Sequence, residues 1–328
     1  VVSSKPLPQL PRTASLGIGF QRVTDVPRIE RPTLALSTGL LVQAADLKAL
    51  IRNRGRLVGR DGVPLPAGVI AAPMTRDLEE QLRRLPKVVA QGVAEPIIGA
   101  SSVPVASRAL WGSLGSPLDG VVDKYFNRPV GHILTKQLVH TSVSPNQVSA
   151  ASILLGLISA WLFAGGMHDM AVLGAIALQL SAILDAVDGD LARVVFKEST
   201  LGKWLDIVGD QVVHVAVFVA IGVGLYRAGS AAPVIALAAS SGVGVVISLI
   251  VVVRGMKQLE RRSNRRLQRL IESTANRDFS VLLLVLAVVD KLDWFLWMAA
   301  LGVHVFWIAV LIVQRSSPPR TDRTERAS

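Results

Sequence analysis

Six apolar segments follow one another in the second half of this 328-residue chain, and their length limits the folds open to it. Several approach the ~20 residues with which a helix crosses a bilayer. In lipid, every backbone polar group must be satisfied within the protein, so we expect α-helices. The segments run over 145–166, 169–194, 202–226, 231–253, 279–292 and 293–314, the last two divided by Asp290, Lys291 and Asp293. The sequence predicts a mainly α protein with a six-helix transmembrane bundle at 145–315.

Composition supports a membrane protein. Hydrophobic residues make up 51% of the chain, and its mean hydropathy is positive, which is too apolar for an ordinary soluble domain. There is no cysteine, which excludes disulfides and thiolate metal sites. The first residues, VVSSKPLPQLPR, lack the apolar core of a secretory signal, so we expect no signal peptide.

Charge between the segments predicts their orientation. Residues 254–277 carry eight Lys or Arg, which places that connection in the cytoplasm of a multi-pass inner-membrane protein. Both termini then lie in the cytoplasm, and the loops around His168, Ala228 and Lys291 face outward. The net charge of +11 is concentrated beside apolar segments, so anionic lipid headgroups are a better partner than nucleic acid.

The sequence predicts a linker and a juxtamembrane amphipathic helix over residues 106–144, and a polar cytoplasmic tail over residues 316–328. Between 117 and 143, apolar residues recur at helical spacing beside Lys124, Arg128 and Lys136, with a break expected at Pro129. This pattern predicts a helix on the cytoplasmic membrane surface. A linker helix packed on the soluble domain explains it equally well.

The sequence of residues 1–105 predicts a small soluble α/β extension. We expect strands at 33–42 and 68–72 and helices at 44–53 and 76–84. This region has no glycine-rich phosphate loop and no cluster of acids, histidines or nucleophiles. Its role does not follow from its sequence, and we do not expect a second activity.

Four aspartates in the apolar half of the chain form two pairs at helical spacing. Asp185 and Asp188 are three residues apart, and Asp206 and Asp210 are four apart, so each pair shares one face of a helix. Two such helices side by side would form a cage of oxygens. Oxygen ligands without cysteine favour a hard cation, Mg²⁺ or Mn²⁺, which typically also binds substrate phosphates.

This stretch resembles the signature of the CDP-alcohol phosphotransferase (CDP-alcohol phosphatidyltransferase) family without a departure. The eight matching positions are Asp185, Asp188, Gly189, Ala192, Arg193, Gly202, Asp206 and Asp210. The resemblance covers about residues 115–315. It implies a six-helix membrane enzyme of phospholipid or phosphodiester biosynthesis that moves a substituted phosphate from a CDP-linked donor to an alcohol and releases CMP.

Two stretches, 111–148 and 275–297, are most similar to the inositol-phosphate branch of the family, which includes di-myo-inositol-phosphate-phosphate synthases. The donor implied is CDP-diacylglycerol or CDP-inositol, and the acceptor an inositol phosphate. Some family members carry an N-terminal nucleotidyltransferase domain, of which residues 1–105 would be a shortened relic. A homodimer is also implied.

The resemblance assigns roles to the four aspartates. The resemblance implies that Asp185, Asp188 and Asp206 are ligands of two divalent cations. It implies that Asp210 is either a further ligand or the base that takes the proton of the acceptor hydroxyl. Such a site would lie near the cytoplasmic face, where the donor and CMP exchange with water.

The resemblance also implies a nucleotide site formed by Asp188, Gly189, Ala192, Arg193 and Gly202. The glycines let a nucleotide or a helix backbone approach closely, and Arg193 would pair with the diphosphate. As alternatives, Arg193 is a basic residue flanking a membrane span, and Ala192 is a packing residue.

Other candidates are weaker. His214 lies one turn beyond Asp210 and is either near the cations or a helix-interface histidine with one hydrogen bond. Candidate acceptor-binding residues are Arg265, Arg266 and Arg277, which a lipid-facing or capping role explains as well.

Two other functional classes remain open. A divalent-cation transporter would need ionisable residues along a path through several helices, and beyond the motif these segments are nearly bare of them. A catalytically inactive scaffold would be expected to have lost some aspartates, and all four are present.

Overall fold

The chain forms two compact units. The computed structural model describes residues 33–37, 39–70, 78–115, 120–195, 197–261, 267, 270 and 279–315. One unit comprises the described residues up to Gly115 together with Gly189–Thr200, and the other comprises Ser116–Asp188 and the described residues from Leu201 onward.

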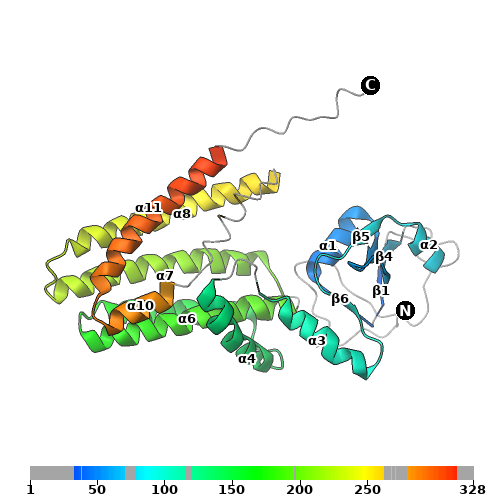
Figure 1. Cartoon of the computed structure of the whole chain (residues 1–328), viewed down its shortest axis with the longest axis horizontal. Helices are drawn as coiled ribbons and strands as arrows, with labels where there is room; N and C mark the ends of the chain where they lie inside the picture. Colours follow the sequence, from blue (N-terminus) through cyan, green and yellow to red (C-terminus); the bar gives the residue numbers. More distant parts are fainter. Residues whose placement is uncertain are drawn as a thin grey trace. The chain divides into compact units, whose positions relative to one another are not determined.

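The N-terminal unit contains a four-stranded and a two-stranded sheet (Figure 1). The larger sheet has the order β1-β4-β3-β5, formed by Thr33–Leu36, Pro64–Ile70, Arg56–Val58 and Lys87–Val89. Its pairs are antiparallel except for β3 with β5. Strands β2 (Leu40–Val42) and β6 (Ala94–Pro96) form the smaller antiparallel sheet. The helices are α1 (Ala44–Asn53), α2 (Leu78–Arg84) and α3 (Val103–Gly112), with a short 3-10 turn η1 (Ala100–Ser102).

The predicted α/β pattern is present with differences in detail. Helices α1 and α2 match the ranges expected from sequence within two residues, and the strand expected at 68–72 is the longer β4. The expected strand at 33–42 is interrupted: the Ser37 hydroxyl accepts a hydrogen bond from Gly39 N, and the chain divides into β1 and β2. Leu47, Leu50 and Leu57 are buried in the core between helix and sheet.

One buried acid fixes the loop after β5. Asp46 on α1 is 1% exposed, and its carboxylate accepts hydrogen bonds from Gln91 N at 2.8 Å and Gly92 N at 3.1 Å. The neighbouring Gln43 accepts from Val93 N and donates to the Ser113 hydroxyl. The loop amides that no strand pairs are therefore satisfied by α1 side chains.

The second unit is a helical bundle whose main helices match the six predicted segments. They are α5 (Pro145–Phe163), α6 (His168–Val194, which continues into the first unit), α7 (Thr200–Arg227), α8 (Val234–Arg261), α10 (Phe279–Val288) and α11 (Leu292–Arg315). Five of them are long and apolar enough to cross a membrane, while α10 has ten residues. The turn at 289–291 separates α10 from α11, as the polar break predicted.

Local signals in the sequence explain where α5 begins. Ser144 caps α5 in a capping box with Gln147, and Pro145 takes the first helical position. Helical residues fill 123–138, within the range predicted for the juxtamembrane helix, and Pro129 does not break them. A π-helical turn η2 (Asp123–Asn127) precedes α4 (Arg128–Leu138), which places Pro129 in the first turn of α4, where a missing N–H costs little.

Three loops of the bundle meet at one end. Arg227 Nη1 donates to Ala164 O at 2.7 Å, which ties the α7–α8 loop to the α5–α6 loop. His168 Nδ1 lies 3.8 Å from Asp290 Oδ1, in the turn between α10 and α11. Because the helices alternate in direction, the second half of α6 and the first half of α7 extend toward the opposite end.

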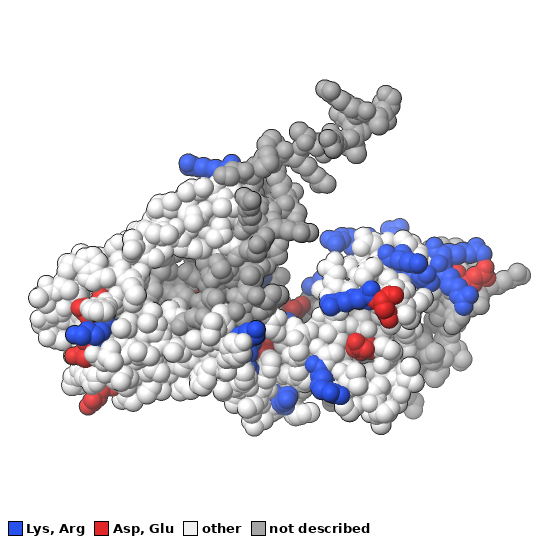
Figure 2. Space-filling model, in the orientation of Figure 1, with Lys and Arg blue, Asp and Glu red and all other residues white. Residues whose placement is uncertain are grey.

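The outer surface of the bundle is apolar. Large hydrophobic side chains are exposed along the helices, among them Leu154, Ile158, Ile176, Leu180, Val212, Val246, Val285, Leu301, Val305 and Ile312. Figure 2 shows the flank of the helices as mostly uncharged, with charged residues gathered near their ends. Trp161, Tyr226, Trp294 and Trp297 are exposed near the end where the three loops meet, as in an aromatic belt. A surface of this kind fits lipid rather than water.

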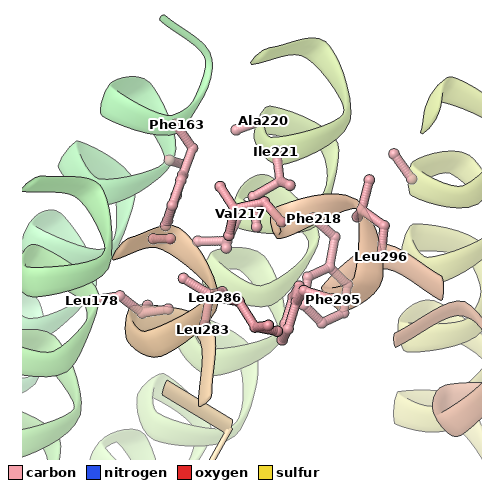
Figure 3. Packing of buried hydrophobic residues seen from close by; sticks show 14 of the residues in the cluster. Phe163, Leu178, Val217, Phe218, Ala220, Ile221, Leu283, Leu286, Phe295 and Leu296 are labelled. Carbon is pink, nitrogen blue, oxygen red and sulfur yellow. The ribbon is translucent and has the colours of Figure 1, made fainter. Parts of the chain in front are cut away.

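The interior is closely packed. One cluster joins Phe163 on α5, Leu178 on α6, Val217 and Phe218 on α7, and Leu283 on α10 (Figure 3). Two glycines, Gly222 and Gly244, allow close contacts between helices of this chain. A side chain at Gly222 would overlap Ala238, and one at Gly244 would overlap Val303.

The Asp46 contacts predict a stability difference in the N-terminal unit. Asp46→Ala removes the buried carboxylate that accepts from the amides of Gln91 and Gly92, and a hydrogen bond to a charged group contributes about 1.5–3 kcal/mol. We expect hydrogen exchange at 91–92 to accelerate at least tenfold in the full-length chain. Asp61→Ala is the control, because Asp61 also accepts from a backbone amide, Val63 N, but in an exposed turn. Equal acceleration in both variants would contradict a special role of the buried carboxylate.

Candidate active site

Three of the four predicted aspartates meet between two helices. Asp185 on α6 and Asp206 and Asp210 on α7 each offer a carboxylate oxygen, and these oxygens lie within 4.8 Å of one another. All three side chains are half-buried. At 1.5 Å per residue, Asp185 lies about 14 Å from the end of α6 and Asp210 about 15 Å from the start of α7. The cluster therefore lies inside the bundle, away from the end where the three loops meet.

Close helix contacts hold this cluster together. Ser152 on α5 and Ser181 on α6 exchange hydrogen bonds, each hydroxyl donating at 2.8 Å to the backbone carbonyl of the other residue. Gly209 precedes Asp210, and a side chain there would overlap Ile153 on α5. Because α5 packs on both helices through small residues, α6 and α7 stay close enough for their carboxylates to meet.

The other residues of the motif lie outside the cluster of three carboxylates. Asp188 is 6% exposed, one turn after Asp185 on α6, and is not one of the three clustered carboxylates. Gly202 is half-buried in the first turn of α7. Gly189, Ala192 and Arg193 belong to the last turns of α6, in the other unit.

Arg193 has partners that the sequence analysis did not consider. Its Nη2 donates to Asp190 Oδ1 at 2.6 Å and to Leu114 O at 3.2 Å. Asp190 is completely buried, whereas the Arg193 side chain is 39% exposed. The i,i+3 spacing of an acid and an arginine was the available signal for this ion pair. Because both contacts use Nη2, the guanidinium keeps an exposed edge.

A small cavity adjoins the cluster. It measures about 10 Å³ and is lined by Ser152, Ile153, Leu178, Ser181, Ala182, Asp210, Val213, His214, Phe279 and Ser280. His214 contacts the edge of Phe279, with ring centroids 5.1 Å apart. This volume fits one water molecule and not an organic substrate, so the cavity itself does not hold one.

A buried polar chain behind this cavity was missed from sequence. The Ser280 hydroxyl donates to Gln179 Oε1 at 2.7 Å, and Gln179 Nε2 donates to Asn127 Oδ1 at 2.6 Å. Asn127 Nδ2 donates in turn to Asp123 Oδ1 at 2.7 Å. The signal was available, because Gln179 lies alone among apolar residues from Met170 to Leu184 except for Ser181.

The donor set fits a hard divalent cation. Three carboxylates at this separation repel one another at neutral pH, and a bound cation would remove that repulsion. Carboxylate oxygens are the ligands that Mg²⁺ and Mn²⁺ prefer. Among the residues that the structure describes, this is the one group of three or more His, Asp or Glu side chains close enough to hold a metal ion.

Comparisons with known proteins agree with the motif. A protein of Thermococcus kodakarensis named bifunctional IPC transferase and DIPP synthase is 38% identical over 95 residues, which are 29% of this chain and 21% of that protein. A protein of Aquifex aeolicus with the same name is 35% identical over 98 residues, 30% of this chain and 22% of that protein. The chain matches only about a fifth of the length of these relatives.

Among solved structures, the chain is similar to phosphatidylinositol phosphate synthase of Mycobacterium tuberculosis. The form in complex with manganese and citrate aligns over 59% of this chain and 92% of that chain, with a TM-score of 0.44 and 17% identity. The form with CDP-DAG bound aligns over 60% and 98%, with the same TM-score and identity.

The family description CDP-alcohol phosphatidyltransferase matches residues 142–313, more than half of the chain and all of the aspartate motif. The relatives named above belong to the inositol-phosphate branch that the sequence predicted. This chain belongs to the CDP-alcohol phosphatidyltransferase family.

Proposed function

We propose that the chain transfers a substituted phosphate from a CDP-linked donor to the hydroxyl of an alcohol and releases CMP. The observation that carries this proposal is the meeting of Asp185, Asp206 and Asp210 between two helices, in a chain of this family. In the reaction, the acceptor oxygen forms a bond to the phosphorus that carries the donor alcohol. The bond from that phosphorus to the bridging oxygen breaks, and CMP leaves.

Two divalent cations, Mg²⁺ or Mn²⁺, are part of this proposal. Asp185, Asp188 and Asp206 would hold them, with Asp210 as a further ligand or as the base. When bound, such a pair neutralises charge on the transferred phosphate and orients the attacking and leaving oxygens. The contribution of the protein is to hold its carboxylates in place through the α5 contacts described above.

Asp210 is the residue we assign to the proton of the acceptor. Its carboxylate faces the other two acids and also lines the small cavity. A carboxylate in this position accepts the hydroxyl proton as the new oxygen–phosphorus bond forms. His214 adjoins the same cavity one turn later, with its ring packed on Phe279, which supports the helix-interface role considered from sequence.

Nucleotide binding is assigned to Asp188, Gly189, Ala192, Arg193 and Gly202. The exposed edge of Arg193 suits a bidentate contact with the diphosphate, while its Asp190 partner holds the side chain in place. Among the residues that the structure describes, a Cβ atom at Gly189 would meet the Arg193 side chain alone, at an ordinary contact distance of 3.6 Å, which suits the approach of a ligand.

For substrates, we propose the inositol-phosphate branch, with CDP-diacylglycerol or CDP-inositol as donor and an inositol phosphate as acceptor. The names of the curated relatives support this branch. The acceptor candidates Arg265, Arg266 and Arg277 lie outside the described residues. No second activity is assigned to the extension at 1–105.

We place the bundle in the cell membrane with six spans, both termini in the cytoplasm and the carboxylate cluster near the cytoplasmic face. The linker and juxtamembrane helix, 106–144, would rest on that face. Val121, Tyr125 and Ile133 are more than half exposed beside Lys124, which suits an anionic lipid surface. A homodimer would need surfaces other than Gly222 and Gly244, which pack within the chain.

The alternatives have less support. A cation transporter needs ionisable groups along a path across the membrane. His304 in α11 is one such group, but its ring nitrogens bond to Ser240 and Trp307 within the bundle. An inactive scaffold would not need the carboxylates to converge. CMP release separates both from an enzyme.

The first prediction is the reaction itself. With Mg²⁺, the purified chain should release CMP from CDP-diacylglycerol or CDP-inositol in the presence of inositol phosphate, in preference to myo-inositol or glycerol phosphate. Asp210→Asn should lower the rate by about 10²-fold or more, since it removes the proposed base. Asp169→Asn, on the same bundle but at the end where the loops meet, should keep the rate of the unchanged chain. If no pair of donor and acceptor gave CMP release, the proposed reaction would be overturned.

The carboxylate cluster predicts a stability effect that needs no substrate. In chelator, Asp206→Asn should melt higher than the unchanged chain, by about 2–4 °C for each kcal/mol of repulsion removed. With Mn²⁺ the order should reverse, because only the unchanged chain keeps all the proposed ligands. Asp169→Asn should have the melting temperature of the unchanged chain, both in chelator and with Mn²⁺. The cation site would be refuted if neither Mn²⁺ nor the substitution changed the melting temperature.

Orientation can be tested by labelling, because the chain contains no cysteine. Ala228→Cys lies in an exposed loop at the end predicted to face outward, and Ser142→Cys lies in an exposed loop before α5. In intact cells, an impermeant maleimide should label Ala228→Cys and spare Ser142→Cys until the membrane is opened. The reverse pattern would invert the proposed topology.

A further inference from the structure

We propose that Asn127, Gln179 and Ser280 are positioning residues that lock the juxtamembrane segment to the wall of the small cavity beside Asp210. This inference rests on the proposed function for its catalytic part. The observation behind it is the hydrogen-bonded chain Asp123–Asn127–Gln179–Ser280, which joins η2, α6 and α10 inside one unit. We call this chain the strut.

Three of the four strut residues are buried. Asn127 is 0% exposed, Gln179 7% and Ser280 1%, so these groups bond to one another instead of to water, while Asp123 at the outer end is partly exposed. The Gln179 amide is used at both ends, accepting from Ser280 and donating to Asn127. Removing either neighbour therefore leaves a buried amide atom without its partner, and the segments it joined are free to shift.

At its inner end the strut fixes the start of α10. Phe279 and Ser280 both line the cavity that Asp210 and His214 also line. While Ser280 bonds to Gln179, Phe279 packs its ring against His214, one turn after Asp210 on α7. The start of α10 thus supports the part of α7 that presents the proposed base.

At its outer end the strut fixes the juxtamembrane segment against the helix that carries Asp185. Gly131 on α4 packs on α6, where a Cβ atom would lie 3.4 Å from Val187 and 3.8 Å from Ala186. Thr135, also buried, donates to Gly131 O at 2.9 Å and keeps its hydroxyl satisfied within α4. The segment therefore contacts α6 over the turns next to the cluster, and the strut is its polar connection to α10.

Rates of transfer reactions depend steeply on such positioning, since a displacement of about 1 Å can cost roughly 10²-fold. We expect Ser280→Ala, Gln179→Ala and Asn127→Ala each to lower kcat by about 10-fold to 100-fold. The KM for the CDP-linked donor should change less than about threefold, because no strut residue is assigned to the nucleotide. Ser280→Thr, which keeps the hydroxyl, should recover most of the rate.

Ser159→Ala is the matched control. Ser159 is fully buried, and its hydroxyl donates to Gly174 O at 2.7 Å, but it lies near the other end of the bundle. If buried hydroxyls matter only for stability, Ser159→Ala and Ser280→Ala should lower the rate equally. The strut requires that only Ser280→Ala lowers kcat.

A double-mutant cycle tests whether the strut acts as one unit. Asn127→Ala and Ser280→Ala change residues that bond to opposite ends of the Gln179 amide. If the strut is one connection, the double variant should be no slower than the slower single variant. If the rate losses of the two single variants multiply in the double variant, the two effects are independent, and this result would overturn the strut.

Hydrogen exchange gives a readout that does not depend on activity. Ser280→Ala should accelerate exchange at residues 123–138 at least fivefold although the substitution is on α10, and Ser159→Ala should leave it unchanged. Unchanged exchange in Ser280→Ala overturns the strut even if the enzyme is active. If exchange responds but the unchanged chain releases no CMP from any donor, the connection stands while its catalytic role fails with the proposed function.

Discussion

The bundle depends on holding carboxylates inside an apolar environment. A single aspartate at the centre of a bilayer costs about 2.5–3.5 kcal/mol on insertion scales, and like charges add repulsion. Helices α6 and α7 have 27 and 28 residues, about 40 Å, which exceeds the ~30 Å of a hydrocarbon core. The cluster lies about 14–15 Å from the helix ends away from the loops, so it is closer to those ends than to the opposite ones. The exchanged Ser152 and Ser181 hydrogen bonds and the close Gly209 contact then keep it assembled.

The parts of the fold that follow from local sequence were predictable. Long apolar segments define the helices, and a capping box with proline at the first position defines the start of α5. Strands β3, β5 and β6 have three residues each, too few to show an alternating pattern, and β5 and β6 pair with the distant strands β3 and β2. The π-helical turn before Pro129 was also missed, because a proline in a helical pattern ordinarily predicts a break.

The meeting of aspartates was predictable in part. Spacings of three and four residues place carboxylates on one helix face, and Asp185, Asp206 and Asp210 do converge. That Asp188 lies outside the group of three depends on how α6 is rotated against α7, which local spacing does not determine. The Ser280–Gln179 hydrogen bond joins residues 101 positions apart, and only the packing of α10 on α6 brings them together.

The polar side chains inside this bundle fall into two groups with different meanings. His304 accepts from Trp307 Nε1 at Nδ1, which leaves Nε2 of a neutral ring to donate to Ser240, so these groups are satisfied by one another. Ser159 is likewise satisfied by Gly174 O. Such pairs add modestly to helix association, about 0.6 kcal/mol on average, and imply no ligand. Asp185, Asp206 and Asp210 instead bring like charges together at the meeting point of α5, α6 and α7. Such an arrangement of carboxylates suits the binding of a divalent cation, which offsets their mutual repulsion.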